Sequence, residues 1–183
     1  MGKITLITGT MFSGKTTKLI SILEELRKNN IFNYSVYRDK PTIANNIPCI
    51  VSHDNWCFPA QRLYNLEQLR KDENKYIFID SIQRVHKDFI DLIFEITNNS
   101  DKEFYLSGIR NTFEGKEYEN ICRLFTYADE IIFLKSKCEN CGNNAIYNVL
   151  RKGMTIETDI NKIQKNKKYK LLCRDCFNKN LNQ

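Results

Sequence analysis

Lys3–Thr17 reads Lys-Ile-Thr-Leu-Ile-Thr-Gly-Thr-Met-Phe-Ser-Gly-Lys-Thr-Thr, and this stretch decides the fold of the chain. Residues 3–8 are rich in Ile and Thr, which predicts a buried strand. Residues 9–16 then read G-x-x-x-x-G-K-T, the pattern of a phosphate-binding loop. Apolar residues recur at helical spacing through residues 15–29, so the loop opens a helix. We therefore predict a nucleotide-binding α/β domain, with phosphates held at the positive end of this helix.

The residue types of this loop suit phosphate chemistry. Gly9 and Gly14 allow the tight turn that points backbone N–H groups at phosphate oxygens. Lys15 places a cation against the terminal phosphates, and Thr16 offers a hydroxyl to Mg²⁺. A chance glycine-rich turn would need neither residue. The predicted ATP-binding residues are Gly9, Thr10, Met11, Phe12, Ser13, Gly14, Lys15, Thr16 and Thr17.

Strand and helix patterns alternate after this loop. The predicted strands cover residues 33–37, 76–79, 103–107 and 130–134, and the predicted helices cover residues 60–69, 85–96 and 117–127. This alternation predicts a parallel sheet with right-handed crossovers. Ligands bind at the carboxyl ends of such strands, where Gly9, Asp80 and Gly108 fall. Residues 39–56 contain two prolines and several asparagines, so we expect an irregular loop over the site.

Length and composition suit a protein of the cytoplasm. The chain has 183 residues, of which 42% are apolar, and no run approaches the length of a membrane span. The phosphate loop begins at residue 9 and leaves no room for a signal peptide before it. We expect a cytoplasmic protein with no membrane partner, in which cysteines stay reduced.

Basic residues gather near the end of the chain. Residues 161–183 carry seven Lys and Arg residues against Asp175 alone, which accounts for the whole net charge of +6. Such a segment can bind nucleic acid. No aromatic stripe accompanies the lysines, however, so we favour a solvated face beside a phosphate site and expect no nucleic-acid partner.

Two cysteine pairs predict a zinc site in the last quarter of the chain. The pairs are Cys138-x-x-Cys141 and Cys173-x-x-Cys176. Four thiolates complete a tetrahedral site, so the predicted role of the zinc is structural. The 31 residues between the pairs predict a long loop. The other cysteines, Cys49, Cys57 and Cys122, are interpreted as buried and unpaired.

The predicted fold is therefore an α/β fold with a second, smaller part. Residues 1–135 form a P-loop parallel sheet with flanking helices. Residues 136–183 form a small C-terminal zinc-binding lobe with a long closing loop.

In order and spacing, these motifs resemble the zinc-containing (type II) thymidine kinases. The likeness covers nearly the whole chain. It rests on the Met-Phe-Ser of the phosphate loop, on Asp39 and residues 52–54, on Gly-Ile-Arg-Asn-Thr-Phe-Glu-Gly at 108–115 and on Tyr-Lys-Leu-Leu-Cys-Arg-Asp-Cys-Phe at 169–177.

This resemblance implies transfer of the ATP γ-phosphoryl group to the 5′-hydroxyl of thymidine or a related deoxynucleoside. Lys15 would stabilise the transferring charge, and Thr16 with Asp80 would hold Mg²⁺ directly or through water. By position, Met11, Phe113 and Tyr169 would line the nucleoside pocket, under the loop between the cysteine pairs. A homo-oligomer, either a dimer or a tetramer, is also implied.

Two segments depart from the family pattern. The family has Asp-Glu-x-Gln-Phe with the Glu as catalytic base, whereas this chain has Asp80-Ser81-Ile82-Gln83-Arg84. Asp80 and Gln83 match, but Ser81 stands at the position of the base. The family's closing loop has Ile-Gly-Gly where this chain has Ile163-Gln164-Lys165.

Three functions therefore stay open. The first is a nucleoside kinase with an altered base, for which Asp39 or Glu114 is a candidate. The second is a catalytically impaired, pseudokinase-like protein that binds ATP or another nucleotide in a regulatory or assembly role. The third, a zinc-ribbon ATPase acting on nucleic acid, is the weakest.

Overall fold

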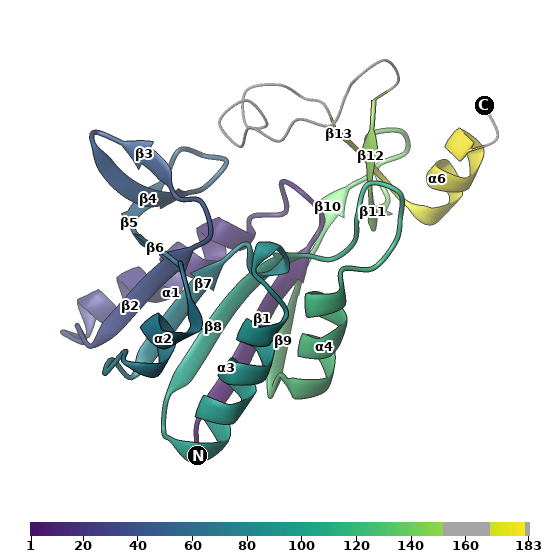
Figure 1. Ribbon diagram of the computed structural model, residues 1–183. Coiled ribbons are helices and arrows are strands. Elements are labelled where there is room, and N and C mark those ends of the chain that lie inside the picture. The colour runs from purple at the N-terminus through teal and green to yellow at the C-terminus, as the bar shows by residue number, and fades with distance from the viewer. Residues whose placement is uncertain (152–168, 182–183) are drawn as a thin grey trace.

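A computed structural model describes residues 1–151 and 169–181 of the chain (Figure 1). Four lysines of the basic segment lie outside these residues. So do Ile163, Gln164 and Lys165 of the expected closing loop. None of the described helices has both the length and the apolar character that a membrane span needs.

The centre of the fold is a six-stranded sheet in the order β6-β2-β7-β8-β1-β9. Its strands are β1 (Lys3–Gly9), β2 (Tyr34–Arg38), β6 (Gln61–Arg62), β7 (Tyr76–Asp80), β8 (Glu103–Ile109) and β9 (Glu130–Leu134). Every neighbouring pair is parallel. The predicted parallel sheet is confirmed, and its carboxyl ends bring the phosphate loop and Asp80 to one edge.

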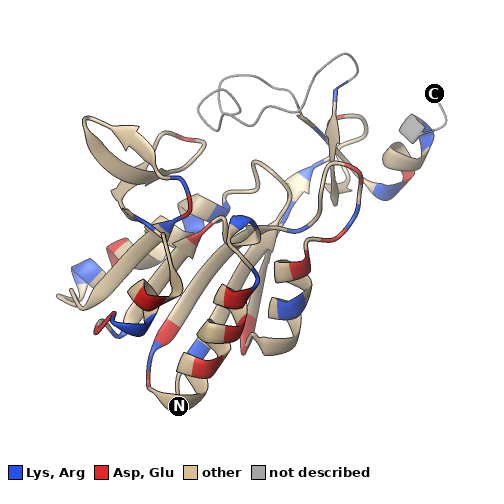
Figure 2. Ribbon diagram, in the orientation of Figure 1, with Lys and Arg blue, Asp and Glu red and all other residues tan. Residues whose placement is uncertain are grey.

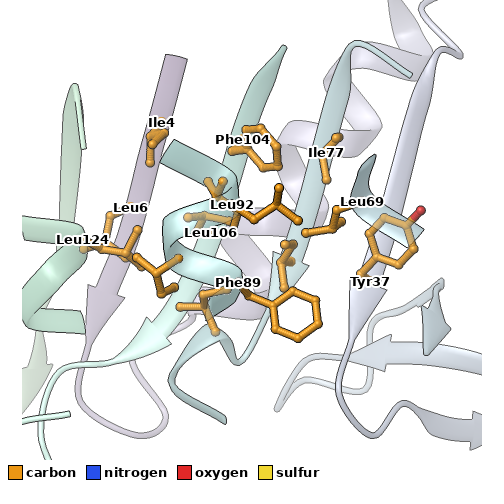
Figure 3. Close-up of a cluster of buried hydrophobic side chains, with 14 of the residues drawn as sticks. Ile4, Leu6, Tyr37, Leu69, Ile77, Phe89, Leu92, Phe104, Leu106 and Leu124 are labelled. Atoms are coloured by element: carbon orange, nitrogen blue, oxygen red, sulfur yellow. The ribbon is translucent and has the colours of Figure 1, made fainter. Parts of the chain in front are cut away.

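Helices cover both faces of this sheet. They are α1 (Lys15–Lys28), α2 (Leu66–Arg70), the 3-10 helix η1 (Ile82–Arg84), α3 (Asp88–Asn99) and α4 (Glu119–Tyr127). Leu6 of β1 belongs to the core cluster that packs under α3 and α4 (Figure 3), whereas Ile7 belongs to the cluster under α1. This alternation follows the two-residue period of a strand. The ribbon of Figure 2 is coloured for acidic residues on α3 and for acidic and basic residues on α4, as expected where one helix face meets water.

Two predicted helices have the wrong bounds. The first turn of the expected helix 60–69 is instead the strand β6, and α2 begins only at Leu66. Asn65 caps this helix, because its side chain accepts from the Gln68 N–H at 3.0 Å. The expected helix 85–96 begins three residues late, at Asp88, after η1.

The expected irregular loop over residues 39–56 is wrong for residues 42–51, although Val51 and His53 do lie at the expected site. This region forms an antiparallel sheet of β3 (Thr42–Ala44), β4 (Ile47–Val51) and β5 (Cys57–Pro59). Asn45 and Asn46 have φ of 49° and 63°, the left-handed pair of a two-residue hairpin turn. The asparagines that suggested a loop are the turn between β3 and β4.

The C-terminal lobe is built from two short antiparallel pairs and a helix. Its elements are β10 (Ser136–Lys137), β11 (Asn144–Ala145), β12 (Tyr147–Leu150), β13 (Tyr169–Leu172) and α6 (Arg174–Leu181). The stacked rings of Tyr147 and Phe177, whose centroids lie 4.1 Å apart, join β12 to α6. The predicted α/β fold with a small C-terminal cysteine lobe is confirmed.

Candidate active site

The phosphate loop has the backbone that its sequence predicts. Gly14 is left-handed, with φ 81°, and caps the N-terminus of α1. Gly9 is required for a different reason, since a Cβ there would lie 2.4 Å from the Leu134 carbonyl oxygen and 2.6 Å from Ser13 Oγ. The loop is therefore packed tightly on β9, and the positive end of α1 faces the site.

Lys15 lies folded into this loop. Its ammonium donates to the Thr10 carbonyl oxygen at 2.5 Å and lies 3.5 Å from Ser13 Oγ. Burial lowers the pKa of Lys15 to about 8, and the attraction of Asp80 only partly opposes this shift. A cation with so few protein partners is suited to a phosphate ligand.

Asp80 is the hub of the polar contacts at the sheet edge. Thr16 Oγ1 donates to Asp80 Oδ1 at 3.1 Å, and Ser107 Oγ donates to the same oxygen. Ser81 Oγ donates weakly to Oδ2 at 3.5 Å, and Arg38 Nη1 lies 3.4 Å from that oxygen. A hydroxyl and a carboxylate side by side are oxygen ligands of the kind that Mg²⁺ takes next to nucleotide phosphates. The residues present therefore fit the metal that the phosphate loop implies.

A cavity joins the loop to the ends of β2, β7 and β8. Its lining residues are Met11, Phe12, Gly14, Lys15, Thr16, Thr17, Arg38, Val51, His53, Asp80, Ser81, Gln83, Arg84, Ser107, Gly108 and Ile109. Of the residues predicted as catalytic, Lys15, Asp80, Ser81 and Gln83 all line it. Among its described lining residues, Asp80 is the one carboxylate.

Other predicted residues lie elsewhere. Phe113 and Tyr169, expected at the nucleoside, are not among the described lining residues, although Met11 is. Tyr169 is buried on β13, where it pairs with Leu150. The proposed substitute bases, Asp39 and Glu114, do not line the cavity, and Glu114 is ion-paired with Lys116 at 2.9 Å.

Ser81 has an uncommon backbone. Its φ of 64° and ψ of 43° are left-handed, which is infrequent for a residue other than glycine, and it leads into η1. The next turn is held from β8, because the Ile109 N–H donates to Gln83 Oε1 at 3.3 Å. Ser81, which stands at the position of the family's base, thus has a strained backbone. It lies between Asp80 and Gln83, whose side chains are held by hydrogen bonds.

Sequence reasoning missed Arg38. It ends β2 next to Asp80 in the sheet register, and its side chain is 9% exposed. The signal was the same as for Asp80, namely a charged residue at the carboxyl end of an apolar strand.

The C-terminal lobe contacts the phosphate loop directly. The Met11 N–H donates to Asn148 Oδ1 at 2.6 Å, and Thr10 Oγ1 donates to Ser136 Oγ at 2.9 Å. Asn148 is buried, and its amide also donates to the carbonyl and side-chain oxygens of Asn111, at 3.2 and 3.1 Å. No sequence motif pointed to Asn148.

The four paired cysteines converge, as predicted. Their sulfurs all lie within 4.8 Å of one another, and those of Cys141 and Cys173 are 3.6 Å apart. Tetrahedral zinc with bonds of about 2.3 Å would place its sulfurs about 3.8 Å apart, so the cluster fits the ion. Burial alone would raise the pKa of Cys138, but N–H groups donating to its sulfur bring that pKa down to about 6. The interpretation of the remaining cysteines is partly wrong, because only Cys49 is buried, while Cys57 and Cys122 are exposed.

A family model described as thymidine kinase matches residues 2–177. The chain belongs to the thymidine kinase family. A thymidine kinase of Pseudothermotoga lettingae is 29% identical over 97% of this chain and 96% of its own length. A thymidine kinase of Ureaplasma parvum serovar 3 is 32% identical over 95% of this chain and 82% of its own length. One from Myxoma virus (strain Lausanne) is 29% identical over 96% of both chains. The resemblance inferred from the motifs is thereby confirmed.

Proposed function

We propose that this protein transfers the γ-phosphoryl group of ATP to the 5′-hydroxyl of thymidine or a related deoxynucleoside. The observation that carries the proposal is the convergence of Lys15, Thr16 and Asp80 on one cavity beside the phosphate loop. Thymidine kinases of similar sequence over nearly their full lengths support the choice of acceptor.

Each of these residues has a role in the proposed reaction. The loop N–H groups and Lys15 hold the β- and γ-phosphates, and Thr16 with Asp80 holds Mg²⁺, which offsets the charge of the phosphates when it is bound. Met11, Phe113 and Tyr169 contact the nucleoside, as the family resemblance implies; Phe113 comes from the segment between β8 and α4, and Tyr169 from β13 of the C-terminal lobe. We also propose a cytoplasmic homo-oligomer with one structural zinc per chain.

Proton removal is the step for which this site is poorly equipped. A serine hydroxyl cannot take the proton of a 5′-hydroxyl at neutral pH, and Asp80 is already occupied by hydroxyl donors and a cation. General base catalysis contributes about 10²–10⁴-fold. Phosphoryl transfer has a loose transition state that depends more on positioning and charge than on a base. The expected result is slow turnover with substrates bound normally.

The test restores the carboxylate. Ser81→Glu should raise thymidine phosphorylation by about 10²-fold or more with little change in KM, because a base acts in the transition state and not in binding. Ser81→Gln is the matched control, since it has the same size and no basic oxygen. A gain shared by both variants, or by neither, would refute the role assigned to position 81.

A catalytically impaired nucleotide-binding protein with a regulatory or assembly role is the second candidate. The observation that favours it is the single carboxylate among the described lining residues. This candidate predicts ATP binding by the parent protein without labelled thymidine monophosphate from γ-labelled ATP. It further predicts no phosphorylation by Ser81→Glu, because the nucleoside is then never held in place.

A further inference from the structure

Arg38 is a buried cation whose guanidinium is only partly satisfied by the described protein. Its side chain is 9% exposed, and it lines the cavity at the carboxyl end of β2. Its Nε and Nη1 find no hydrogen-bond acceptor among the described residues. Nη1 lies 3.4 Å from Asp80 Oδ2, so charge attraction holds this pair without a hydrogen bond of good geometry. A guanidinium buried in this way is costly unless another acceptor arrives.

The charge of the cavity favours an anion as that acceptor. Lys15, Arg38 and Arg84 bring three Lys and Arg side chains to the lining, which also holds His53, against Asp80 as the one carboxylate among its described residues. Asp80 also accepts from Thr16 and Ser107. One carboxylate shared in this way cannot neutralise both Lys15 and Arg38. The planar fork of an arginine matches the oxygens of a phosphoryl group and can bind two of them at once.

The position of Arg38 in the sheet indicates which phosphoryl group it meets. The loop follows β1, and β8 and β7 lie between β1 and β2. Thr16 reaches Asp80 Oδ1 from the loop, whereas Arg38 approaches Asp80 Oδ2 from β2. Arg38 is therefore across Asp80 from the loop, where a chain of phosphates held by the loop would end.

We propose that Arg38 binds the terminal phosphoryl group of the nucleoside triphosphate and stabilises its charge as it is transferred. In this role Lys15 and Arg38 hold the group from two sides, and Asp80 orients the guanidinium while it also serves the metal. The inference rests on the proposed function only in that a nucleoside triphosphate occupies the cavity.

Binding of three ligands measures this role without any turnover. Calorimetry with Mg²⁺–ATP, Mg²⁺–ADP and thymidine monophosphate should be run on the parent protein and on Arg38→Met. Loss of a charged hydrogen-bonding partner should weaken ATP binding by about 10- to 100-fold. ADP lacks the terminal phosphoryl group, so its affinity should change by less than about 3-fold, and thymidine monophosphate should behave like ADP.

Two further variants separate charge, geometry and folding. Arg38→Lys keeps the charge but loses the planar fork of the guanidinium. Its preference for ATP over ADP should therefore be weaker than that of the parent and stronger than that of Arg38→Met. Arg62→Met is the matched control, because Arg62 pairs with Arg38 in the neighbouring strand yet is exposed and outside the cavity lining. Without nucleotide, Arg38→Met should unfold at a lower temperature than the parent, since it removes one partner of a buried ion pair and leaves Asp80 behind, so ligand binding is measured well below that temperature.

The outcomes distinguish this inference from the proposed function. The role of Arg38 would be overturned if Arg38→Met weakened ATP and ADP binding equally, weakened neither, or weakened only the binding of thymidine monophosphate. The nucleotide site itself would still stand in each case. Failure of the parent protein itself to bind Mg²⁺–ATP would overturn both.

Discussion

Asn148 of the C-terminal lobe accepts a hydrogen bond from the Met11 N–H of the phosphate loop, at 2.6 Å. The two residues are 137 positions apart. Asn148 is also held by two bonds to Asn111, so it joins the loop after β1, the segment after β8 and the lobe. The cysteine lobe is thus linked to the loop that would bind phosphates.

Asn148→Ala should weaken both stability and nucleotide binding. The substitution leaves the Met11 N–H without its acceptor and should lower the free energy of unfolding by about 1–3 kcal/mol. The affinity for Mg²⁺–ATP should fall because the loop is less well ordered. Urea denaturation and calorimetry measure the two effects. Asn144→Ala, at an exposed position of β11, is the control, and equal effects from both substitutions would contradict the link.

Lys15 should make stability depend on pH in the absence of nucleotide. Its pKa is about 8 in the folded protein against an ordinary value of 10.5. Between these values the unfolded chain binds a proton that the folded chain does not, so stability rises with pH across this window. Below pH 8 the folded protein carries a buried charge at a cost of about 3 kcal/mol.

Lys15→Met should therefore be more stable than the parent at pH 7, and this advantage should shrink by pH 9.5. Urea denaturation at both pH values measures it. Lys18→Met, one turn further along α1 and outside the cavity lining, controls for loss of a lysine. An advantage of the same size at both pH values would show that the Lys15 ammonium is not desolvated.

Zinc should be bound at one equivalent per chain and should hold the C-terminal lobe together. Cys173→Ser should lower the zinc content below half an equivalent, because it removes a buried ligand of the four-sulfur cluster. Metal analysis of the purified protein measures this. Cys122→Ser, at an exposed cysteine outside the cluster, should keep the full content. A disulfide between any two of the four would contradict the site.

Cys173→Ser should also weaken ATP binding. Cys173 directly follows β13, and β13 pairs with β12, the strand that carries Asn148. A chelator that removes the metal should have the same effect on the parent protein. Unchanged ATP affinity after zinc removal would show that the lobe and the loop are independent.

Ser81→Gly should stabilise the protein relative to Ser81→Ala. At φ 64° a residue with a Cβ is strained by about 1–2 kcal/mol, and glycine is not. The larger backbone entropy of glycine in the unfolded chain offsets part of this gain. Thermal unfolding of the two variants gives the difference. An alanine variant as stable as the glycine variant would mean that position 81 is not held in the left-handed region in solution.

Local patterns in the sequence were enough for the parallel sheet, the phosphate loop and the four-cysteine cluster. The phosphate loop and each cysteine pair depend on residues close together in the chain, such as Gly14 before Lys15, or Cys138 three residues before Cys141, and the sheet follows from the order of such local strand and helix patterns. Backbone geometry and ligand chemistry restrict such short patterns strongly. The hairpin turn at Asn45 and Asn46 was local too, but its asparagines were interpreted only as loop residues.

Only the tertiary structure decided which distant groups meet in the site. Arg38 faces Asp80 because β2 and β7 pair with the register that places these residues side by side. Asn148 reaches Met11 because the C-terminal lobe folds back over the phosphate loop. Neither contact has a sequence pattern, since register and packing are set by the burial of the whole core and not by the residues in contact.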